Sequence, residues 1–303
     1  MARLRIEEFH FKPAESGLLV PIGTTGSVRE HSSHTYLNIK EKAQQVEVLY
    51  RRNGLKINMT SDLGRLIGLA VDLSDAWFLN RMNDVSDETL FNVCYFEKIA
   101  SSLLEAQEEP NIKEYLQKLS GSVLDPFLRE HSTAKDAAWE LELFSSLKRR
   151  GILVSLQEPD IVATYGEKRI AIACKKLYSS NHVQSIASNA NKQIRESSAP
   201  GIIALNIDNL IAPEVHRNSS TFDEVGGYLN SFNMDFLRSN ERHIRKYLET
   251  RGLLAALVST STIAIVPGER QSLNYARETL IWHIPGISTA QSDDFRLLLS
   301  SFA

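Results

Sequence analysis

Two side chains in the middle of the chain, Asp160 and Lys175, have the types and spacing that phosphodiester chemistry requires. Cleaving a phosphodiester takes a metal ion to polarise the phosphate, a water held in line, and a positive group near the developing negative charge. Carboxylates such as Asp160 bind the ion, and a lysine such as Lys175 supplies the positive group. The elements that carry these two residues therefore decide whether they can act together.

Strand alternation predicts which side chains share a face with Lys175. Residues 169–175, which follow a turn, are predicted to form a strand, and alternate side chains of a strand point to the same face. Ala173 and Lys175 therefore share one face, and we expect the other face to pack against the core. Asp160 begins the preceding strand, and pairing around a turn at residues 166–168 places it across from Ala173 and Lys175.

A third candidate group is Glu140, on a helix expected to end at Gly151 and to begin after a cap at Ser132 or Thr133. Glu140 falls within the apolar face of this helix, and Glu142 falls on the opposite side. A glutamate in an apolar face must be paired, protonated or bound to a metal, because an unpaired buried carboxylate is costly. The apolar face consists of Trp139, Leu143, Phe144 and Leu147.

A second helix, expected over residues 183–196, carries Gln193 between apolar positions. An inward glutamine can orient an active-site residue or a phosphate. Lys192 and Arg195 flank the same face, and we expect both of them, together with Lys176, to contact a nucleic-acid backbone.

The elements around these residues follow the order α-β-β-β-α-β and predict an α/β domain over residues 131–303. Its strands are expected at 152–156, 161–165, 169–175 and 202–207, with a later helix at 234–251 and a strand at 253–266. Residues 1–130 are predicted to form a mixed, mainly helical N-terminal region. In that region we expect a strand at 3–11, a loop at 21–33 and one or two strands within 45–59.

The segment from residue 133 to residue 207, about a quarter of the chain, resembles the PD-(D/E)XK nuclease superfamily. That family has an acidic residue on a helix, a Pro-Asp at a strand start and an acidic-x-Lys on the next strand, followed by a helix and a fourth strand. Each motif alone is common, but their order and spacing agree with the expected elements. The matching residues are Trp139-Glu140, Pro159-Asp160, Ala173-Cys174-Lys175, Asn191-Lys-Gln-Ile194 and Gly201-Ile-Ile-Ala-Leu205.

Position 173 departs from this pattern, because the family has an acidic residue there and this chain has Ala173. Three interpretations remain open. The acid was removed on purpose to disable an enzyme, or the chain is a naturally degenerate relative, or Glu140 or Glu158 supplies the missing ligand.

The resemblance implies a restriction-endonuclease-like fold and a nuclease that uses Mg²⁺ or Mn²⁺. Asp160, Glu140 and the acid at position 173 would hold the metal, and Lys175 would position or activate the attacking water. We expect DNA as the substrate, cut poorly by this sequence, and a role in anti-phage defence with a partner protein. The alternative is an inactive module of the same fold that binds nucleic acid or a partner protein.

Composition agrees with a soluble protein, which we expect to be cytoplasmic and not bound to membrane. Hydrophobic residues make up 43% and charged residues 23% of the chain, and its longest apolar runs are too short to cross a bilayer. The net charge of −3 disfavours a protein that coats DNA but not an enzyme with a local basic surface. Cys94 and Cys174 are expected to be buried thiols, and His31 and His34 lack a third metal ligand.

Overall fold

The structure is a computed structural model that describes residues 3–13, 19–211, 216–219, 221–249, 253–265 and 272–283. The helices are α1 (Tyr36–Arg52), α2 (Asp62–Phe78), α3 (Asp87–Glu105), α4 (Ile112–Gly121), α5 (Thr133–Arg149), α6 (Val183–Glu196) and α7 (Phe222–Leu248). The strands are β1 (Arg3–Pro13), β2 (Leu19–Thr35), β3 (Leu153–Gln157), β4 (Asp160–Tyr165), β5 (Lys168–Lys176), β6 (Gly201–Asn206), β7 (His216–Asn218), β8 (Leu253–Ile265) and β9 (Ser272–His283). The segment from α5 to β6 therefore has the expected order α-β-β-β-α-β.

One mixed sheet holds all the described strands, in the order β1-β2-β9-β8-β6-β5-β4-β3, with β7 added alongside β8. The strands β5, β6 and β8 are parallel to one another, and the pairs on either side of them are antiparallel. Strands β5 and β6 end together at Lys176 and Asn206, and Asn206 pairs with Ser259 in the middle of the longer β8. In α/β sheets such an edge commonly carries the ligand site.

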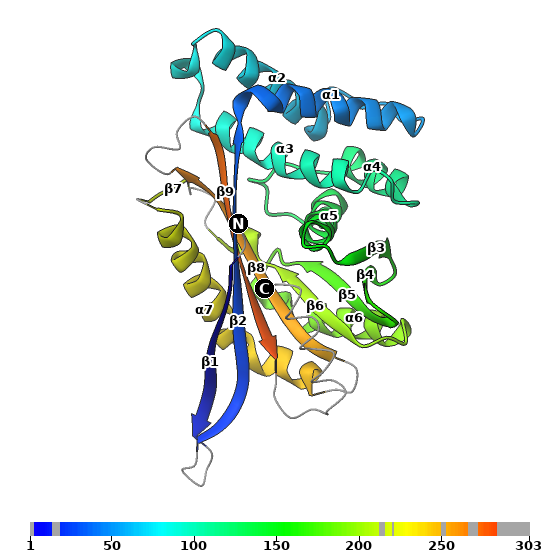
Figure 1. Ribbon diagram of the computed structural model, residues 1–303, viewed down its shortest axis with the longest axis vertical. Coiled ribbons are helices and arrows are strands. Elements are labelled where there is room, and N and C mark those ends of the chain that lie inside the picture. Colours follow the sequence, from blue (N-terminus) through cyan, green and yellow to red (C-terminus); the bar gives the residue numbers. More distant parts are fainter. Residues whose placement is uncertain are drawn as a thin grey trace.

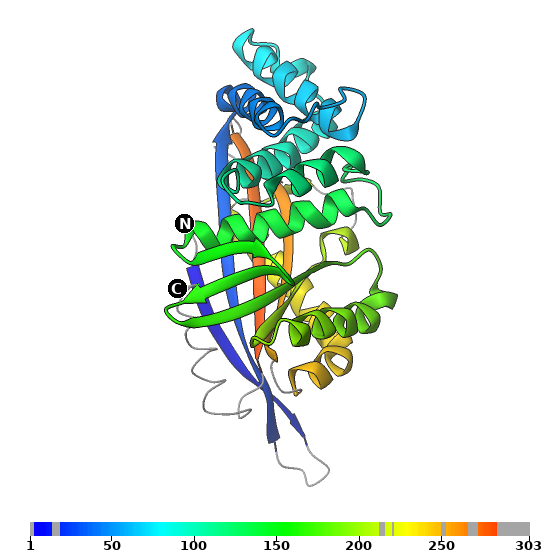
Figure 2. The ribbon, with the colours of Figure 1, turned by 90° about the vertical axis from the view of Figure 1, so that its right-hand side faces the viewer.

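Helices cover both faces of this sheet (Figures 1 and 2). On one face α5 packs against β3, β4 and β5, and helices α3 and α4 pack on α5. On the other face α6 packs against β5 and β6, and α7 packs against β8 and β9. The central strands are consequently buried from both sides, as is usual for parallel strands.

Helix α5 lies at the centre of the molecule. The Ser132 hydroxyl accepts hydrogen bonds from the first backbone N–H groups of the helix, and Gly151 follows its end with a φ of 78°, as expected for the residue after a helix. The indole N–H of Trp139 donates to the carbonyl of Ala204 on β6, at 3.3 Å. The helix is buried on all sides over residues 137–147, so Glu142, on the side opposite the apolar face, is buried as well.

Two local expectations for the N-terminal region are also wrong. Residues 21–33, expected to be a loop, lie within β2, which pairs with β1 on one side and β9 on the other. Pairing with strands far away in the sequence overrides the turn preference of Gly, Ser and Thr. Residues 45–59, expected to hold one or two strands, hold none, and 45–52 are the second half of α1, where Val46, Leu49 and Tyr50 are buried at helical spacing.

The residues before and after the expected domain boundary at 130 and 131 share one sheet and one apolar core. Strands β1 and β2 belong to the same sheet as β3 to β9, and one apolar core contains residues from both sides of the boundary. None of the helices in the described part of the chain combines the length and apolar character needed to cross a membrane.

Candidate active site

Asp160 and Lys175 occupy one site at the start of β4 and the end of β5. The ammonium group of Lys175 donates to Asp160 Oδ2 at 3.1 Å, and the backbone N–H of Cys174 donates to the same oxygen at 2.7 Å. The antiparallel register, in which Ile161 lies opposite Ile172, produces this contact. Asp160 precedes that pair by one residue, so it stands across from Ala173.

Burial and charge act in opposite directions on Asp160. The Asp160 side chain is 14% exposed and that of Lys175 is 22% exposed. Burial raises the pKa of Asp160 by more than the Lys175 ammonium and the Cys174 N–H lower it, so the pKa lies above its ordinary value. The pair is sheltered but reachable by water.

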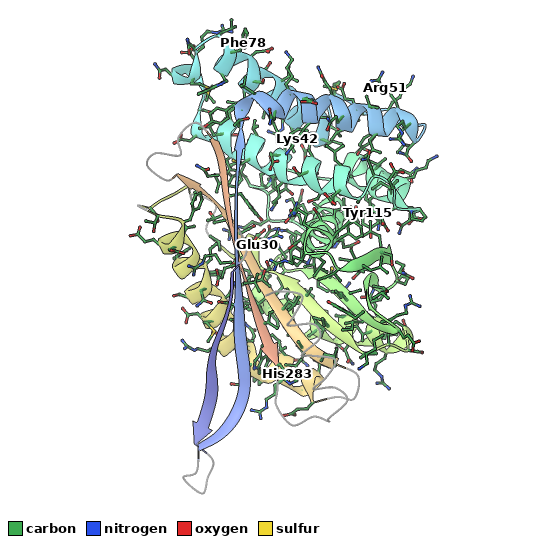
Figure 3. All side chains as sticks on the ribbon, viewed as in Figure 1. Glu30, Lys42, Arg51, Phe78, Tyr115 and His283 are labelled. Carbon is green, nitrogen blue, oxygen red and sulfur yellow. The ribbon has the colours of Figure 1, made fainter. Side chains whose placement is uncertain are left out.

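Glu140 reaches the same region from α5. Tyr115 lies on α4 (Figure 3), and its hydroxyl donates to Glu140 Oε2 at 2.8 Å. Burial, and then the negative charge of Asp160, raise the pKa of Glu140 to about 7. The charge of Lys175 lowers it, so all three candidate groups influence one another electrically. Tyr115 lies in the N-terminal region, and no motif in the sequence connected it with this site.

Ala173 lies on the α6 side of β5 and is fully buried. Its neighbours in that apolar cluster include Leu177, Val183 and Ala187. The expectation that only the opposite face of the strand is packed is therefore wrong, because α6 covers the face that carries Ala173. The Asp160–Lys175 pair lies where this covering ends.

The remaining predicted site residues are placed differently from one another. Gln193 on α6 is partly buried, and its side-chain oxygen is buried without a hydrogen-bond partner in the described part of the chain. Lys192 and Arg195 are exposed on the same helix. Lys176 was expected to contact nucleic acid together with Lys192 and Arg195, but it is not on the surface. Its side chain is only 8% exposed, and its ammonium group donates to Asn206 at 2.8 Å. Strand alternation turns it to the side away from Lys175.

The two carboxylates near Lys175 do not form a complete set of metal ligands. Among the described residues, no group of three or more His, Cys, Asp or Glu side chains gathers closely enough to hold a metal ion. Residue 173, where the family pattern has an acid, is an alanine that stands across from Asp160. Cys94 and Cys174 are both buried free thiols, as predicted. The side chains of His31 and His34 lie outside the described residues.

A second group of charges, which sequence reasoning missed, lies on the other side of β5. Glu142 of α5 binds Arg277 of β9, and it also pairs with Lys98 of α3 at 2.9 Å. Lys98 and Lys176 each lie 3.9 Å from Asp208, directly after β6. These residues come from five separate elements, so no spacing along the sequence connects them.

Comparison with known proteins identifies no relative: no protein-family model, curated protein or solved structure matches this chain. The geometry of its own residues must therefore carry the functional assignment.

Proposed function

We propose that this chain is a metal-dependent nuclease with a restriction-endonuclease-like core, which hydrolyses nucleic-acid phosphodiesters and is impaired by Ala173. The observation that carries the proposal is the 3.1 Å contact of Asp160 with Lys175, beside a Glu140 whose pKa Asp160 raises. The α-β-β-β-α-β order of the elements supports it too, since the resemblance to that superfamily rests on this order. DNA is the expected substrate.

The donor set suits a divalent cation in part. Asp160 and Glu140 are two buried carboxylates whose mutual repulsion a cation would relieve. Mg²⁺ is usually held by one or two carboxylates together with substrate phosphate and water. Asp160 and Glu140 would hold the ion, and with no third acid they would hold it weakly. When bound, such an ion polarises the phosphate and makes a bound water more acidic.

The chain's own residues have distinct parts in this proposal. The Cys174 N–H fixes the Asp160 carboxylate at the strand start. The ammonium group of Lys175 lies beside that carboxylate, where it can stabilise the negative charge that develops on a phosphate. Glu140, with a pKa of about 7, can accept or release a proton near neutral pH. Lys192 and Arg195 on exposed α6 are the proposed contacts to the nucleic-acid backbone.

The direct test is to restore an acid at position 173. Ala173→Glu and the uncharged variant of the same size, Ala173→Gln, are assayed on plasmid, linear and single-stranded DNA, and on RNA, with Mg²⁺ or Mn²⁺. We expect Ala173→Glu to cut at least on the order of 10²-fold faster than the parent chain, because one electrostatic group at a reacting centre has about that effect. Ala173→Gln should stay at the parent rate.

Two controls make the result specific. Adding Asp160→Ala to Ala173→Glu should abolish the restored cutting, since the other carboxylate is then lost. Because Ala173 is fully buried, thermal unfolding must show that each variant folds, and the smaller Ala173→Asp replaces Ala173→Glu if it does not. Folded acidic variants that stay inert on every substrate with both metals would contradict the nuclease proposal.

The second candidate is a catalytically inactive module that binds nucleic acid or a partner protein. It is favoured by Ala173, which packs within a continuous apolar cluster, and by the missing group of three metal ligands among the described residues. Inert acidic variants together with DNA binding that is lost on Lys192→Ala and Arg195→Ala would support it. Under either candidate, the resemblance suggests anti-phage defence with a partner protein, which phage challenge of cells carrying the parent chain or Asp160→Ala would test.

A further inference from the structure

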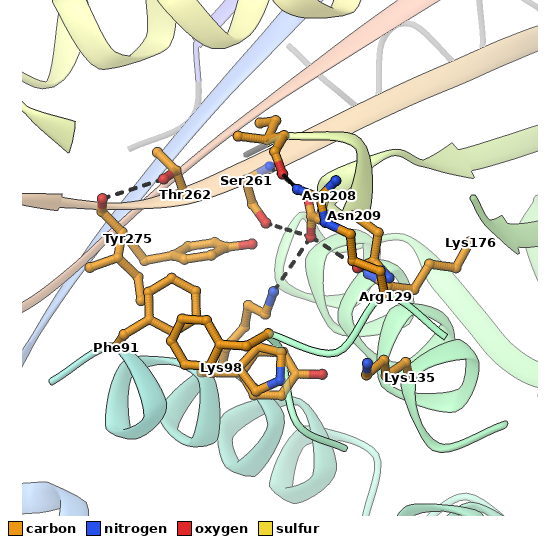
Figure 4. A pocket seen from close by; sticks show the side chains of 15 residues that line it. Phe91, Lys98, Arg129, Lys135, Lys176, Asp208, Asn209, Ser261, Thr262 and Tyr275 are labelled. Carbon is orange, nitrogen blue, oxygen red and sulfur yellow. Dashed lines mark hydrogen bonds and ion pairs between the residues drawn. The ribbon is translucent and has the colours of Figure 1, made fainter. Parts of the chain in front are cut away.

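A cavity of about 90 Å³ opens at the carboxyl ends of the parallel strands (Figure 4). Its walls come from the end of β5, the residues after β6, strands β8 and β9, helices α3 and α5, and the segment between α4 and α5. Lys176 belongs to this cavity, whereas its neighbour Lys175 belongs to the Asp160 site on the other side of the strand. The cavity is therefore separate from the candidate active site and took no part in the proposed function.

Cations outnumber carboxylates in its lining. The four cations are Lys98, Arg129, Lys135 and Lys176, and the one carboxylate is Asp208. The Asp208 oxygens are already occupied by the backbone N–H of Ser261 at 2.7 Å and its hydroxyl at 2.8 Å. An excess of positive charge in a partly enclosed space favours an anionic ligand.

Two of these cations have no carboxylate partner within 4.0 Å in the described part of the chain. Lys98 is matched by Glu142, and Lys176 lies 3.9 Å from Asp208. Within the described ranges, Arg129 donates to the carbonyl of Ile211, at 2.7 Å, and Lys135 donates to the carbonyl of Leu128. Lys135 is buried and most needs an anion, whereas Arg129 is exposed and can add a second positive charge to the same ligand.

Lys135 is the strongest sign of a missing anion. It is 1% exposed, and burying an ammonium group without an opposite charge costs free energy. Burial lowers the pKa of Lys135, and the positive charge of Lys176 lowers it further. The charges of Asp125, Glu130 and Asp62 raise it by less, so the pKa stays below its ordinary value. An anion between these two lysines would stabilise both charges.

An unused hydrogen-bond donor lies in the same cavity. The side-chain nitrogen of Asn209 is buried and has no acceptor among the residues that the structure describes. Buried polar groups in folded proteins nearly always have partners, so an orphan donor beside unmatched cations points to an absent acceptor. With Arg129, Lys135 and Lys176, it provides a set of donors for a group with several oxygens.

The other wall of the cavity is aromatic. Phe91 and Phe127 pack together with ring centroids 4.8 Å apart, and Tyr275 lies against the Lys98 ammonium. Figure 4 shows Phe91 and Tyr275 on one side and Arg129, Lys135 and Lys176 on the other. This arrangement suits a ligand with an anionic end and an apolar or planar end.

We propose that this cavity binds the phosphate group of a small phosphorylated molecule, with Arg129, Lys135, Lys176 and Asn209 as its donors. A phosphate monoester carries about −1.5 to −2 charges at neutral pH, which matches the two unmatched cations, whereas a carboxylate would match one. A volume of about 90 Å³ is roughly that of three water molecules and accommodates one phosphate group. Any attached group lies along the aromatic wall.

The test measures binding to the full chain by calorimetry, with thermal unfolding as a second readout. The ligands are inorganic phosphate and adenosine monophosphate, with chloride at matched ionic strength as the blank. We expect both phosphates to bind and to raise the unfolding temperature. Equal affinities would mean that phosphate alone is recognised, and tighter binding of the nucleotide would mean that the aromatic wall contributes.

Lys135→Met is the informative variant, because it keeps the length of the side chain and removes the charge. We expect it to fold with unchanged or greater stability, as buried unmatched charges often can be replaced by apolar groups, and to bind phosphate at least about tenfold more weakly. Lys113→Met, at an exposed position on α4, should bind as the parent does. Asn209→Ala leaves the lysines in place and should also weaken phosphate binding. It provides the test if Lys135→Met does not fold.

Three results would overturn the proposal. One is the absence of binding of either phosphate to the parent chain at millimolar concentration. Another is equal binding to the parent, Lys135→Met and Asn209→Ala. The third is that a 5′-phosphorylated oligonucleotide binds while inorganic phosphate and adenosine monophosphate do not. The cavity would then bind the end of a nucleic acid and not a small molecule. None of these results depends on whether the Asp160 site cuts nucleic acid.

Discussion

The carboxyl group of Glu140 has a pKa well above that of an exposed glutamate. It is buried on α5, accepts a hydrogen bond from Tyr115 and lies in the field of Asp160, which together leave its pKa at about 7. Between its ordinary pKa of 4.5 and that value, the folded chain binds more protons at this residue than the unfolded chain does. The free energy of unfolding must therefore fall as the pH rises through this window.

Replacing Glu140 with glutamine should remove this pH dependence while keeping an acceptor for Tyr115. We expect Glu140→Gln to gain stability relative to the parent as the pH rises from 5 to 8, by up to about 3 kcal/mol. Urea unfolding at several pH values measures the difference, and Glu114→Gln, at an exposed position on α4, should show a nearly constant one. A Glu140→Gln difference that stays constant across this range would show that Glu140 titrates normally.

At the scale of elements, the contact of α6 with β6 depends on the absence of a side chain at Gly201. A Cβ atom there would lie 2.4 Å from Ile194 Cγ2 and 2.8 Å from the carbonyl oxygen of Ala171. Both distances are shorter than real contacts allow, so α6 would have to move off the strand. Gly227 on α7 is the opposite case, because a Cβ atom there meets nothing within 4 Å.

The two Gly→Ala variants should consequently change stability in opposite directions. We expect Gly201→Ala to lower the free energy of unfolding by about 1–3 kcal/mol through overpacking. Gly227→Ala should raise it by up to about 1 kcal/mol, because alanine favours a helix more than glycine does. Denaturant midpoints of the two variants measure this, and a Gly201→Ala chain as stable as the parent would mean that α6 is not held so closely to β6.

At the scale of the whole molecule, a buried ion-pair network joins the two parts of the sequence. Arg277 of β9 binds Glu142 of α5 and lies 3.9 Å from Glu30 of β2, which Arg150 also binds at 2.7 Å (Figure 3 labels Glu30). Glu142 in turn pairs with Lys98 of α3. Residues from both sides of the expected boundary at 130 therefore share one set of charges.

Removing the central cation of this network should destabilise the molecule as a unit. We expect Arg277→Met to cost about 3–5 kcal/mol, because it leaves buried carboxylates with less compensation. Arg245→Met, which removes pairs on the surface of α7 with Glu241 and Glu249, should cost at most about 1 kcal/mol. Similar losses for both variants in chemical denaturation would show that the buried network contributes little more than surface pairs.

Local patterns in the sequence were sufficient to predict the order of helices and strands from α5 to β6. The Ser132 cap, the glycine at 151 and the alternation along β5 are short-range signals, and they brought Asp160 and Lys175 to one site as expected. Short-range signals act through backbone geometry within one or two elements, which is why they predict a hairpin and its register. They also sufficed to place the two cysteines in the core.

Only the tertiary structure decided what surrounds those elements. The strand character of residues 21–33 comes from pairing with β1 and β9, and the covering of Ala173 comes from α6. Tyr115 beside Glu140 and the cationic cavity with Lys135 likewise bring together residues from separate elements. The sequence by itself determined which side chains share a strand face or a helix face. Which faces are covered, and which charges meet, depended on long-range packing, because the free energy of those contacts exists only once distant segments are folded together.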